Sequence, residues 1–373
     1  MHDSQGAEDR APTLCTARAI RVCSMPAIGG PDPYKERLYG CMDSSRVSVA
    51  TGSVALLWPV ARHRTFNIIH LHNVQGYLQR DSWLAHVFRI AEYFLWLIEC
   101  RLLGMKIVWT VHNYYPHEAR HPTLERLTSM LTAHLSNSVL VHFKSARVFV
   151  QRHFAKRNNI FVIPQGNFVG CYPNSATKTD ARHELGLDSD SFVYLFFGNI
   201  RPYKGLEHAV GTFSRISRKG DVLLVAGQSS GGLTAEHVTR LCSRPRVRLH
   251  LGFVPTERVQ LFFHAADIVL LPYHEVCNSG QLALAMTFGK PVICPTIGAF
   301  DEVAEPTFSI RYEPGDVGGL GRAMSAAKTV DLQAMGSAAY RAVSKYRWEE
   351  IGPRVQGIFE QLVRGARRLD ERL

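Results

Sequence analysis

Two cationic side chains on a glycine-bounded loop are the first sign of chemistry in this chain. Arg201 and Lys204 lie in the loop from Gly198 to Gly205, directly after the apolar run 192–197, which predicts a buried parallel strand. Ligands of open α/β sheets bind at the carboxyl ends of strands. A guanidinium fork and an ammonium point charge together suit a diphosphate. Two cations on a loop are usually a solvated surface, so a second element is needed.

That second element is a small polar turn that opens a helix. Asn278, Ser279 and Gly280 follow the apolar run 267–271, and the apolar stretch after them predicts a short helix that ends near Gly289. The free N–H groups and the dipole of a helix N-terminus attract phosphate. An ordinary strand–turn–helix is the alternative. Two such strand-end elements in one alternating domain favour a phosphate-containing ligand.

A third group of polar residues follows a predicted strand in the N-terminal half. His112, His117 and Glu118 come just after the apolar run 106–111. A carboxylate beside a histidine could remove a proton from a hydroxyl group, and Glu118 or His117 is favoured over His112 for this role. The alternative is that His117 and Glu118 cap a helix that starts after Pro116.

The loop 27–34 is predicted to lie at the mouth of the first strand. Its glycines, Gly29 and Gly30, would allow a phosphate or an acceptor to approach the backbone closely. Asp32 in the same loop is a second candidate base. The alternative is a plain turn.

Several segments resemble known glycosyltransferases. Residues 198–207, Gly-Asn-Ile-Arg-Pro-Tyr-Lys-Gly-Leu-Glu, are similar to the "G-x-x-R-P-Y-K-G" loop of nucleotide-sugar glycosyltransferases of the GT-B fold, and residues 279–291 resemble their "S-G-x-L-x-x-A-x-x-x-G-x-P" donor segment. Residues 69–72 and 109–118 resemble the "H-L-H" and "T-x-H-N-x-x-P-H-E" segments of exopolysaccharide glycosyltransferases. The resemblance runs from about Pro31 to Leu362. It is nearest to the β-mannosyltransferase type of xanthan-like assembly, with glycosyltransferase family 4 as the broader neighbour.

The resemblance implies an α/β protein of the GT-B fold, with two Rossmann-like domains facing across a cleft and a C-terminal helix that returns to the N-terminal domain. It implies a hexosyltransferase, with mannose from GDP-mannose favoured and a lipid-linked or polysaccharide acceptor, and no cofactor. No metal is expected, because Arg201, Lys204 and the N–H groups near Ser279 can stabilise the charge of a leaving diphosphate. The expected donor-binding residues are Gly198, Arg201, Lys204, Glu275, Asn278, Ser279, Gly280 and Gln281. The expected acceptor- and sugar-binding residues are His72, His112, Asn113, Gly29, Gly30 and Tyr34, and the catalytic candidates are Glu118, His117 and Asp32.

One position departs from the family 4 pattern. Family 4 enzymes carry two glutamates eight residues apart, and the second, which holds the nucleotide ribose, is replaced here by Leu284; the position eight residues earlier is Val276. Leucine accepts no hydrogen bond, so we expect ribose recognition from elsewhere, with Glu275 as one possibility. The departure favours the β-mannosyltransferase branch over a retaining UDP-sugar transferase. A phosphorylase or epimerase remains open, as does a non-catalytic nucleotide-sugar-binding protein.

The length of 373 residues suits two domains. The Pro/Gly/Asn-rich stretch 163–174 predicts the boundary between them. We therefore expect a disordered N-terminus over 1–17, an acceptor domain over 18–168, a nucleotide-sugar domain over 169–345 and a returning C-terminal helix over 346–373.

The eight cysteines and 17 histidines suggest neither a disulfide framework nor a metal site. No cysteine pair has C-x-x-C spacing, and several cysteines lie in apolar runs, which favours free thiols in a reducing compartment. His70 and His72 alternate along a predicted strand, but no zinc-binding ligand pattern accompanies them.

Positive charge is concentrated in the N-terminal half. Residues 101–180 hold 10 Lys and Arg against 3 Asp and Glu, and the segment 143–157 mixes aromatic with basic side chains, as interfacial helices do. A solvated helix face is the alternative, and no nucleic-acid motif is present. The apolar segment 83–103 contains charges, so it is expected to be a core-facing helix that does not span a membrane. With an acidic, polar N-terminus and no secretory signal, the chain is predicted to be cytoplasmic, at the inner face of the cell membrane.

Overall fold

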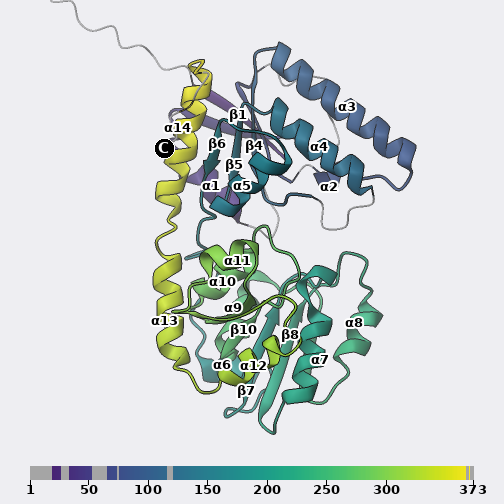
Figure 1. The fold of residues 1–373 in the computed structure, drawn as a ribbon. Coiled ribbons are helices and arrows are strands. Elements are labelled where there is room, and N and C mark those ends of the chain that lie inside the picture. Colours follow the sequence, from purple (N-terminus) through teal and green to yellow (C-terminus); the bar gives the residue numbers. More distant parts are fainter. Residues whose placement is uncertain are drawn as a thin grey trace, which may run out of the picture.

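The computed structural model describes residues 19–26, 33–52, 65–73, 75–115, 121–366 and 369. The predicted disordered segment 1–17 lies outside the described residues. The described chain contains two parallel sheets, and each has helices on both faces (Figure 1).

The first sheet has six strands in the order β2-β1-β3-β4-β5-β6. Consecutive strands from β3 to β6 are neighbours, so their right-handed crossover helices α3, α4 and α5 cover one face, while α1 and the distant α14 cover the other. The bounds are β1 (Ile20–Met25), α1 (Tyr34–Gly40), β2 (Val47–Thr51), β3 (Ile68–Leu71), α2 (Gln75–Leu78), α3 (Trp83–Leu102), β4 (Lys106–Val111), α4 (Pro122–Leu135), β5 (Ser138–Val141), α5 (Lys144–His153) and β6 (Ile160–Val162).

The second sheet has the order β12-β11-β10-β7-β8-β9. Its bounds, with those of the helices around it, are α6 (Lys178–Glu184), β7 (Phe192–Phe197), η3 (Pro202–Lys204), α7 (Leu206–Ile216), β8 (Asp221–Gly227), α8 (Ala235–Cys242), β9 (Val247–Leu251), α9 (Thr256–Ala265), β10 (Ile268–Leu270), α10 (Gly280–Thr287), β11 (Val292–Pro295), α11 (Gly298–Val303), β12 (Ser309–Tyr312), α12 (Gly319–Ala326) and α13 (Leu332–Val343). Strands β8 and β9 follow β7 on one side of the sheet, and β11 and β12 follow β10 on the other side. The crevice of this sheet therefore lies between β7 and β10, at its topological switch point.

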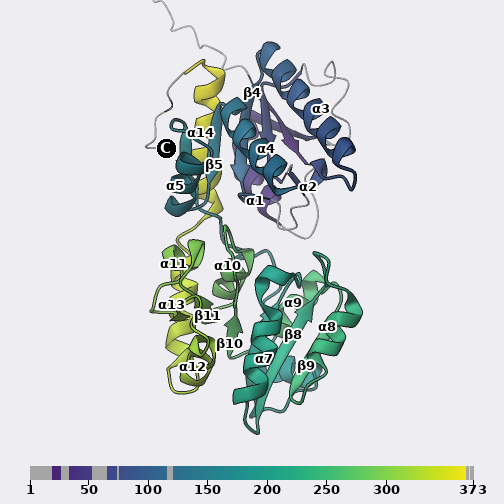
Figure 2. The same ribbon diagram turned by 45° about the vertical axis from the view of Figure 1, so that its right-hand side comes forward.

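The C-terminal helix α14 (Trp348–Val363) returns from the second sheet to the first (Figures 1 and 2). It packs on α1 and β1, and its apolar face is buried with Val22, Ile68 and Val108. At its start, the Trp348 indole donates a hydrogen bond to the Asn167 carbonyl oxygen at 2.6 Å. The indole also lies where a Cβ atom at position 166 would be, so Gly166 is required for this contact.

A second contact joins the domains at α5. The Glu302 carboxylate on α11 accepts hydrogen bonds from the backbone N–H groups of Lys144 (2.9 Å) and Ser145 (3.0 Å), the first residues of α5. A carboxylate at a helix N-terminus is favourable because it satisfies free N–H groups and the helix dipole. The two domains are thus linked through α14 and through α11.

Candidate active site

The glycine-bounded loop after β7 lies against the exit of β10. Gly205 has φ +71°, and a Cβ atom there would clash with the Pro272 carbonyl oxygen. In the same contact, the His274 N–H donates to the Tyr203 carbonyl oxygen at 2.8 Å. The two strand-end elements predicted from the sequence therefore meet at the switch point of the second sheet.

Lys204 is buried in this loop, and no described carboxylate compensates its charge. Its side chain is 6% exposed, its ammonium lies 5.8 Å from the centre of the Tyr273 ring, and it forms no ion pair with a described carboxylate. Burial, and secondarily the nearby Arg201, lower the pKa of Lys204 to about 7. Arg201 is half-buried, and its Nε donates to the Ser230 hydroxyl oxygen at 3.2 Å. A buried, uncompensated ammonium provides a strong reason for an anion to bind here.

The N-terminus of α10 lies beside this loop. The Ser279 hydroxyl oxygen caps α10 by accepting from the Leu282 N–H at 3.2 Å. The amide oxygens of Asn278 and Gln281 are buried and have no hydrogen-bond partner among the described residues. Unpaired buried amides are costly, so a ligand that donates hydrogen bonds would be stabilising. Glu275, in contrast, is exposed.

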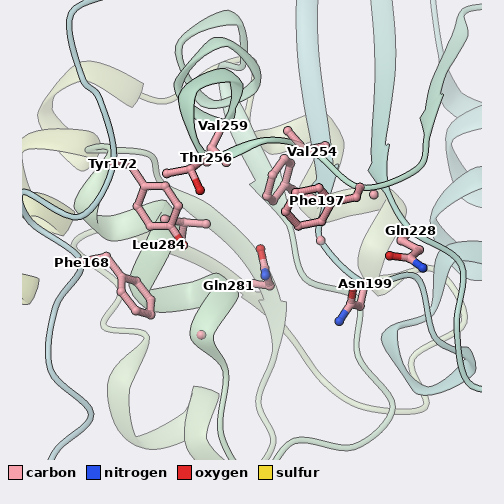
Figure 3. Close-up of a pocket in the computed structure, with 14 residues that line it drawn as sticks. Phe168, Tyr172, Phe197, Asn199, Gln228, Val254, Thr256, Val259, Gln281 and Leu284 are labelled. Atoms are coloured by element: carbon pink, nitrogen blue, oxygen red, sulfur yellow. The ribbon is translucent and has the colours of Figure 1, made fainter. Parts of the chain in front are cut away.

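A cavity of about 420 Å³, here named the C-terminal cavity, opens between these elements (Figure 3). Gln281 extends into its middle, with Asn199 and Gln228 on one side and the Phe168 and Tyr172 rings on the other. The full lining is Phe168, Tyr172, Phe197, Gly198, Asn199, Gly227, Gln228, Phe253, Val254, Thr256, Val259, Gly280, Gln281 and Leu284. The volume and the mixture of aromatic walls with a few polar groups are typical of a small-molecule site.

Leu284 lies in the wall of this cavity, at the position where the family 4 pattern has a ribose-binding glutamate. The polar side chains that line the same cavity are Asn199, Gln228, Thr256 and Gln281. The sequence motifs pointed only to Gln281. Asn199 and Gln228 follow the strands β7 and β8, so the strand-end rule could have found them, whereas Thr256 is brought there by the start of α9.

On the N-terminal side, four histidines form a continuous hydrogen-bonded chain, here named the histidine chain. Tyr39 bridges His70 Nδ1 (2.8 Å) and His72 Nε2 (3.0 Å), His72 Nδ1 contacts His112 Nε2 (3.1 Å), and His112 Nδ1 contacts His142 Nε2 (3.3 Å). At the ends, His70 Nε2 contacts the Thr110 hydroxyl (2.8 Å) and His142 Nδ1 contacts the Ile163 carbonyl oxygen (2.9 Å).

The ends of the chain fix the proton on every ring. A carbonyl oxygen only accepts, so His142 Nδ1 donates and its Nε2 accepts from His112. The same alternation continues through His72, the Tyr39 hydroxyl and His70 to Thr110, which donates. Each ring nitrogen of the four histidines has a matching hydrogen-bond partner only when all four rings are neutral. Burial lowers the pKa of His70 to about 3 and that of His142 to about 4, and it lowers those of His72 and His112 well below the ordinary value.

The structure places the predicted acceptor-side residues as follows. His72 is buried in the histidine chain, and Tyr34 is buried edge-on against His72, His112 and His142. His112 and Asn113 are half-buried after β4, and both ring nitrogens of His112 are taken up within the chain. The predicted residues Gly29, Gly30, Asp32, His117 and Glu118 lie outside the described residues.

A second cavity brings the two sides together. It measures about 330 Å³, and its lining includes His142 and Gln165 from the first domain and Asn278 and Ser279 from the second. One end of the histidine chain therefore lies across a small space from the N-terminus of α10. Nothing in the sequence indicated this contact, because it depends on how the two domains face each other.

Metal coordination is not suggested by these histidines, since their ring nitrogens point to one another. Across the described ranges there is no group of three or more His, Cys, Asp or Glu placed to hold a metal ion. The seven cysteines of the described ranges, Cys23, Cys41, Cys100, Cys171, Cys242, Cys277 and Cys294, are all free thiols.

Comparison with known proteins agrees with this architecture. Residues 191–327 match the family described as "Glycosyl transferases group 1". The chain is 28% identical over 314 residues to a D-inositol 3-phosphate glycosyltransferase of Segniliparus rotundus, covering 76% of this chain and 68% of that protein. It is 24% identical over 290 residues to a GDP-mannose:glycolipid 4-beta-D-mannosyltransferase of Xanthomonas campestris pv. campestris, covering 76% of each.

Solved structures share the fold. Sucrose-phosphate synthase from Thermosynechococcus elongatus superposes with a TM-score of 0.75 at 16% identity, over 94% of this chain and 100% of that one. Anabaena HepE in complex with UDP gives a TM-score of 0.71 at 16% identity, over 92% of this chain and 100% of that one. The predicted GT-B fold is confirmed.

Proposed function

Because the chain is a glycosyltransferase with the GT-B fold and a glycosyl transferases group 1 domain, we propose that it transfers mannose from GDP-mannose to a lipid-linked or polysaccharide acceptor. The relative from Xanthomonas campestris, named for GDP-mannose and a glycolipid, supports this donor and acceptor. The product would contribute to exopolysaccharide or glycolipid assembly.

The observation that carries the proposal is the concentration of positive charge at the switch point. Lys204 and Arg201 lie near each other in the loop after β7, and both the start of this loop and the start of α10 line the C-terminal cavity. A nucleotide-sugar donor has a diphosphate that gains negative charge as the sugar leaves. Fixed cations and oriented N–H groups stabilise that charge in the transition state more than in the ground state, which is the requirement for catalysis.

The nucleoside would occupy the C-terminal cavity. Leu284 removes the carboxylate that binds ribose in family 4, so Gln281 and Thr256 are the proposed partners for the ribose hydroxyls. Hydrogen bonds to a ligand would also satisfy the unpaired amide oxygen of Gln281. The absence of the glutamate supports the β-mannosyltransferase branch over a retaining UDP-sugar transferase.

In an inverting transfer, the acceptor hydroxyl oxygen forms a bond to C1 of the sugar as the bond from C1 to the diphosphate breaks, and a base takes the hydroxyl proton. Both ring nitrogens of His112 are already hydrogen-bonded in the histidine chain, so it is a weak candidate base. Glu118, His117 and Asp32 therefore remain the proposed bases. The proton passes to one of these side chains and then to solvent.

We further propose that the enzyme works without a divalent metal and at the inner face of the cell membrane. The cations and N–H groups at the switch point can neutralise the diphosphate directly. No helix in the described ranges has the length and apolarity needed to span a bilayer. The basic balance of residues 101–180 supports peripheral association with an anionic surface.

The test is a donor panel. The protein is incubated with radiolabelled GDP-mannose, UDP-glucose, UDP-galactose and UDP-N-acetylglucosamine in the presence of a bacterial membrane extract, and lipid-extractable label is counted. We expect label from GDP-mannose, and NMR of the isolated product should show a β-linkage. Label from a UDP-sugar with none from GDP-mannose would contradict the donor assignment. Label with an α-linkage would contradict the inverting branch.

A further inference from the structure

Helix α3 is apolar on two opposite sides. Its buried residues are His86, Tyr93, Trp96, Leu97 and Cys100. On the opposite side, Leu84, Phe88, Leu95, Ile98 and Leu102 fall within a stripe of about 80° when plotted at the α-helical period. Phe88 is 73% exposed, Leu95 68% and Leu102 82%. The predicted core-facing helix therefore accounts for only one of its two apolar sides.

This exposure is concentrated in one place. Among the described residues, fourteen large apolar side chains are exposed, and eight of them belong to α3, the residue after it and α4. These eight are Trp83, Leu84, Phe88, Leu95, Ile98, Leu102, Leu103 and Leu127. Isolated exposed apolar residues are normal, whereas a contiguous group marks an interaction surface.

The position of α3 suits a surface that must stay accessible. Helices α3, α4 and α5 cover the same face of the first sheet, in that order (Figures 1 and 2). In both views α3 lies on the side of the molecule away from α13 and α14, which link the domains. Helix α3 starts at the carboxyl-end edge of the first sheet, the edge that also carries the histidine chain.

The outward sides of the neighbouring helices carry positive charge. The segment 143–157 contains five Lys and Arg and no Asp or Glu. Of these, Arg152 on α5 and Arg157 just after it are exposed, as is Arg126 on α4, whereas Lys144 lines the second cavity between the domains. An apolar stripe with exposed cations on the neighbouring elements is complementary to an anionic bilayer, whose headgroups attract the charges while its acyl chains receive the apolar side chains.

We propose that the outward face of α3, α4 and α5 is the membrane-docking surface of the protein, with α3 inserted at the level of the acyl chains of an anionic bilayer. The alternative occupant is a second copy of the chain. A two-fold interface would bring the same patch on each copy together, so that the cations would face cations, which disfavours it. The proposal rests on the proposed function, since it assigns a surface to the membrane association proposed above, and a lipid-linked acceptor gives this docking a purpose.

The experiment measures partitioning onto vesicles and needs neither donor nor acceptor. Wild-type protein is sedimented with phosphatidylglycerol–phosphatidylcholine vesicles. We expect Phe88→Ser/Leu95→Ser to lower the partition coefficient at least about 100-fold, since two large apolar side chains would no longer be buried. The matched control is Val317→Ser/Val330→Ser, which removes two exposed apolar side chains from the second domain and should bind within about two-fold of wild type.

Two further measurements complete the test. Arg152→Gln/Arg157→Gln should weaken binding about 10-fold or more at low salt and by little at 0.5 M NaCl, because screening removes the electrostatic part. Trp83 is 55% exposed, so vesicles should shift its fluorescence to the blue, and Trp83→Phe should abolish that shift. If Phe88→Ser/Leu95→Ser unfolds at a lower temperature than wild type, Leu84→Ser/Leu102→Ser replaces it.

Wild-type protein that does not bind anionic vesicles, or serine variants that bind within about three-fold of wild type, would overturn the proposal. A wild-type dimer that becomes monomeric in Phe88→Ser/Leu95→Ser while vesicle binding is unchanged would assign the surface to a second copy. Vesicle binding without mannosyl transfer would count against the proposed donor and acceptor alone.

Discussion

The C-terminal cavity and the histidine chain both have polar side chains at the carboxyl ends of parallel strands. The two regions differ in whether these side chains have hydrogen-bond partners within the protein. At the switch point beside the cavity, Lys204 has no ion pair with a described carboxylate, and the amide oxygens of Asn278 and Gln281 have no hydrogen-bond partner among the described residues. In the histidine chain, every ring nitrogen is hydrogen-bonded to another member or to Thr110 or Ile163. Unpaired polar groups indicate where a ligand binds, whereas a closed network indicates a structural role.

The largest expected effect concerns the closed network. The four histidines take up protons at a lower pH in the folded chain than in the unfolded chain. Their effect on the free energy of unfolding is therefore most favourable above about pH 6.5, and this free energy falls as the pH decreases below that value. Each histidine that stays neutral costs about 1.4 kcal/mol per pH unit below that value, until its own folded pKa is reached. We expect chemical denaturation at pH 7.5 and pH 5.5 to show a loss of several kcal/mol.

A matched pair of variants isolates the histidine chain as the cause. His142→Gln should flatten the dependence of the unfolding free energy on pH between 6.5 and 5, even if it is less stable at neutral pH. His134→Gln, an exposed histidine of α4 in the same domain, should leave that slope unchanged. Equal slopes in wild type and His142→Gln would show that the acid sensitivity comes from other groups.

The second prediction concerns the cations at the switch point. Arg201→Ala and Lys204→Ala should each lower kcat/KM for the sugar donor by about 100-fold or more, the size expected for the loss of one charge-stabilising group. Steady-state kinetics with purified protein checks this. Arg258→Ala is the control, because Arg258 is an exposed arginine whose ion pair with Glu184 lies on the surface. Activity within about three-fold of wild type in both variants would remove the diphosphate assignment.

A third prediction compares one unpaired and one paired buried amide. Gln281→Leu should raise the KM of the donor about 10-fold, for the loss of one or two hydrogen bonds, while leaving thermal stability unchanged or higher. Gln356 accepts from the Asp43 N–H at 2.8 Å and donates to Glu360 at 3.0 Å. Gln356→Leu should therefore cost about 1–3 kcal/mol of stability with no change in KM. The reverse pattern would mean that Gln281 is structural.

The smallest expected effect is that of metal removal. If Arg201, Lys204 and the N-terminus of α10 neutralise the diphosphate, kcat/KM should be the same in excess EDTA as in buffer containing Mg²⁺. Assays after dialysis against EDTA check this. Activity that disappears on dialysis and returns specifically with Mn²⁺ would contradict the proposal and call for ligands near the cavity.

Local sequence was sufficient to predict the two strand-end elements that meet at the switch point, because their signals are contiguous. The loop Gly198–Gly205 and the turn 278–281 each follow a buried strand, and the alternation of strands and helices places both at one edge of one sheet. Glu275 shows the limit of that reasoning, since it lies one residue from the expected spacing and is exposed to solvent. The walls formed by Phe168 and Tyr172 come from the segment between the domains, and no local pattern marks them.

The sequence by itself determined the two parallel sheets and the cationic strand-end loop, because each follows from periodicity or from a short motif, and its resemblance to GT-B glycosyltransferases implied the returning C-terminal helix. Only the tertiary structure decided that His70, His72, His112 and His142 join into one chain and that the second apolar side of α3 is left exposed. Both depend on contacts between residues far apart in the sequence. The hydrophobic pattern of the sequence shows which side chains are apolar. The packing of the helices on the sheet determines which of these apolar side chains are buried.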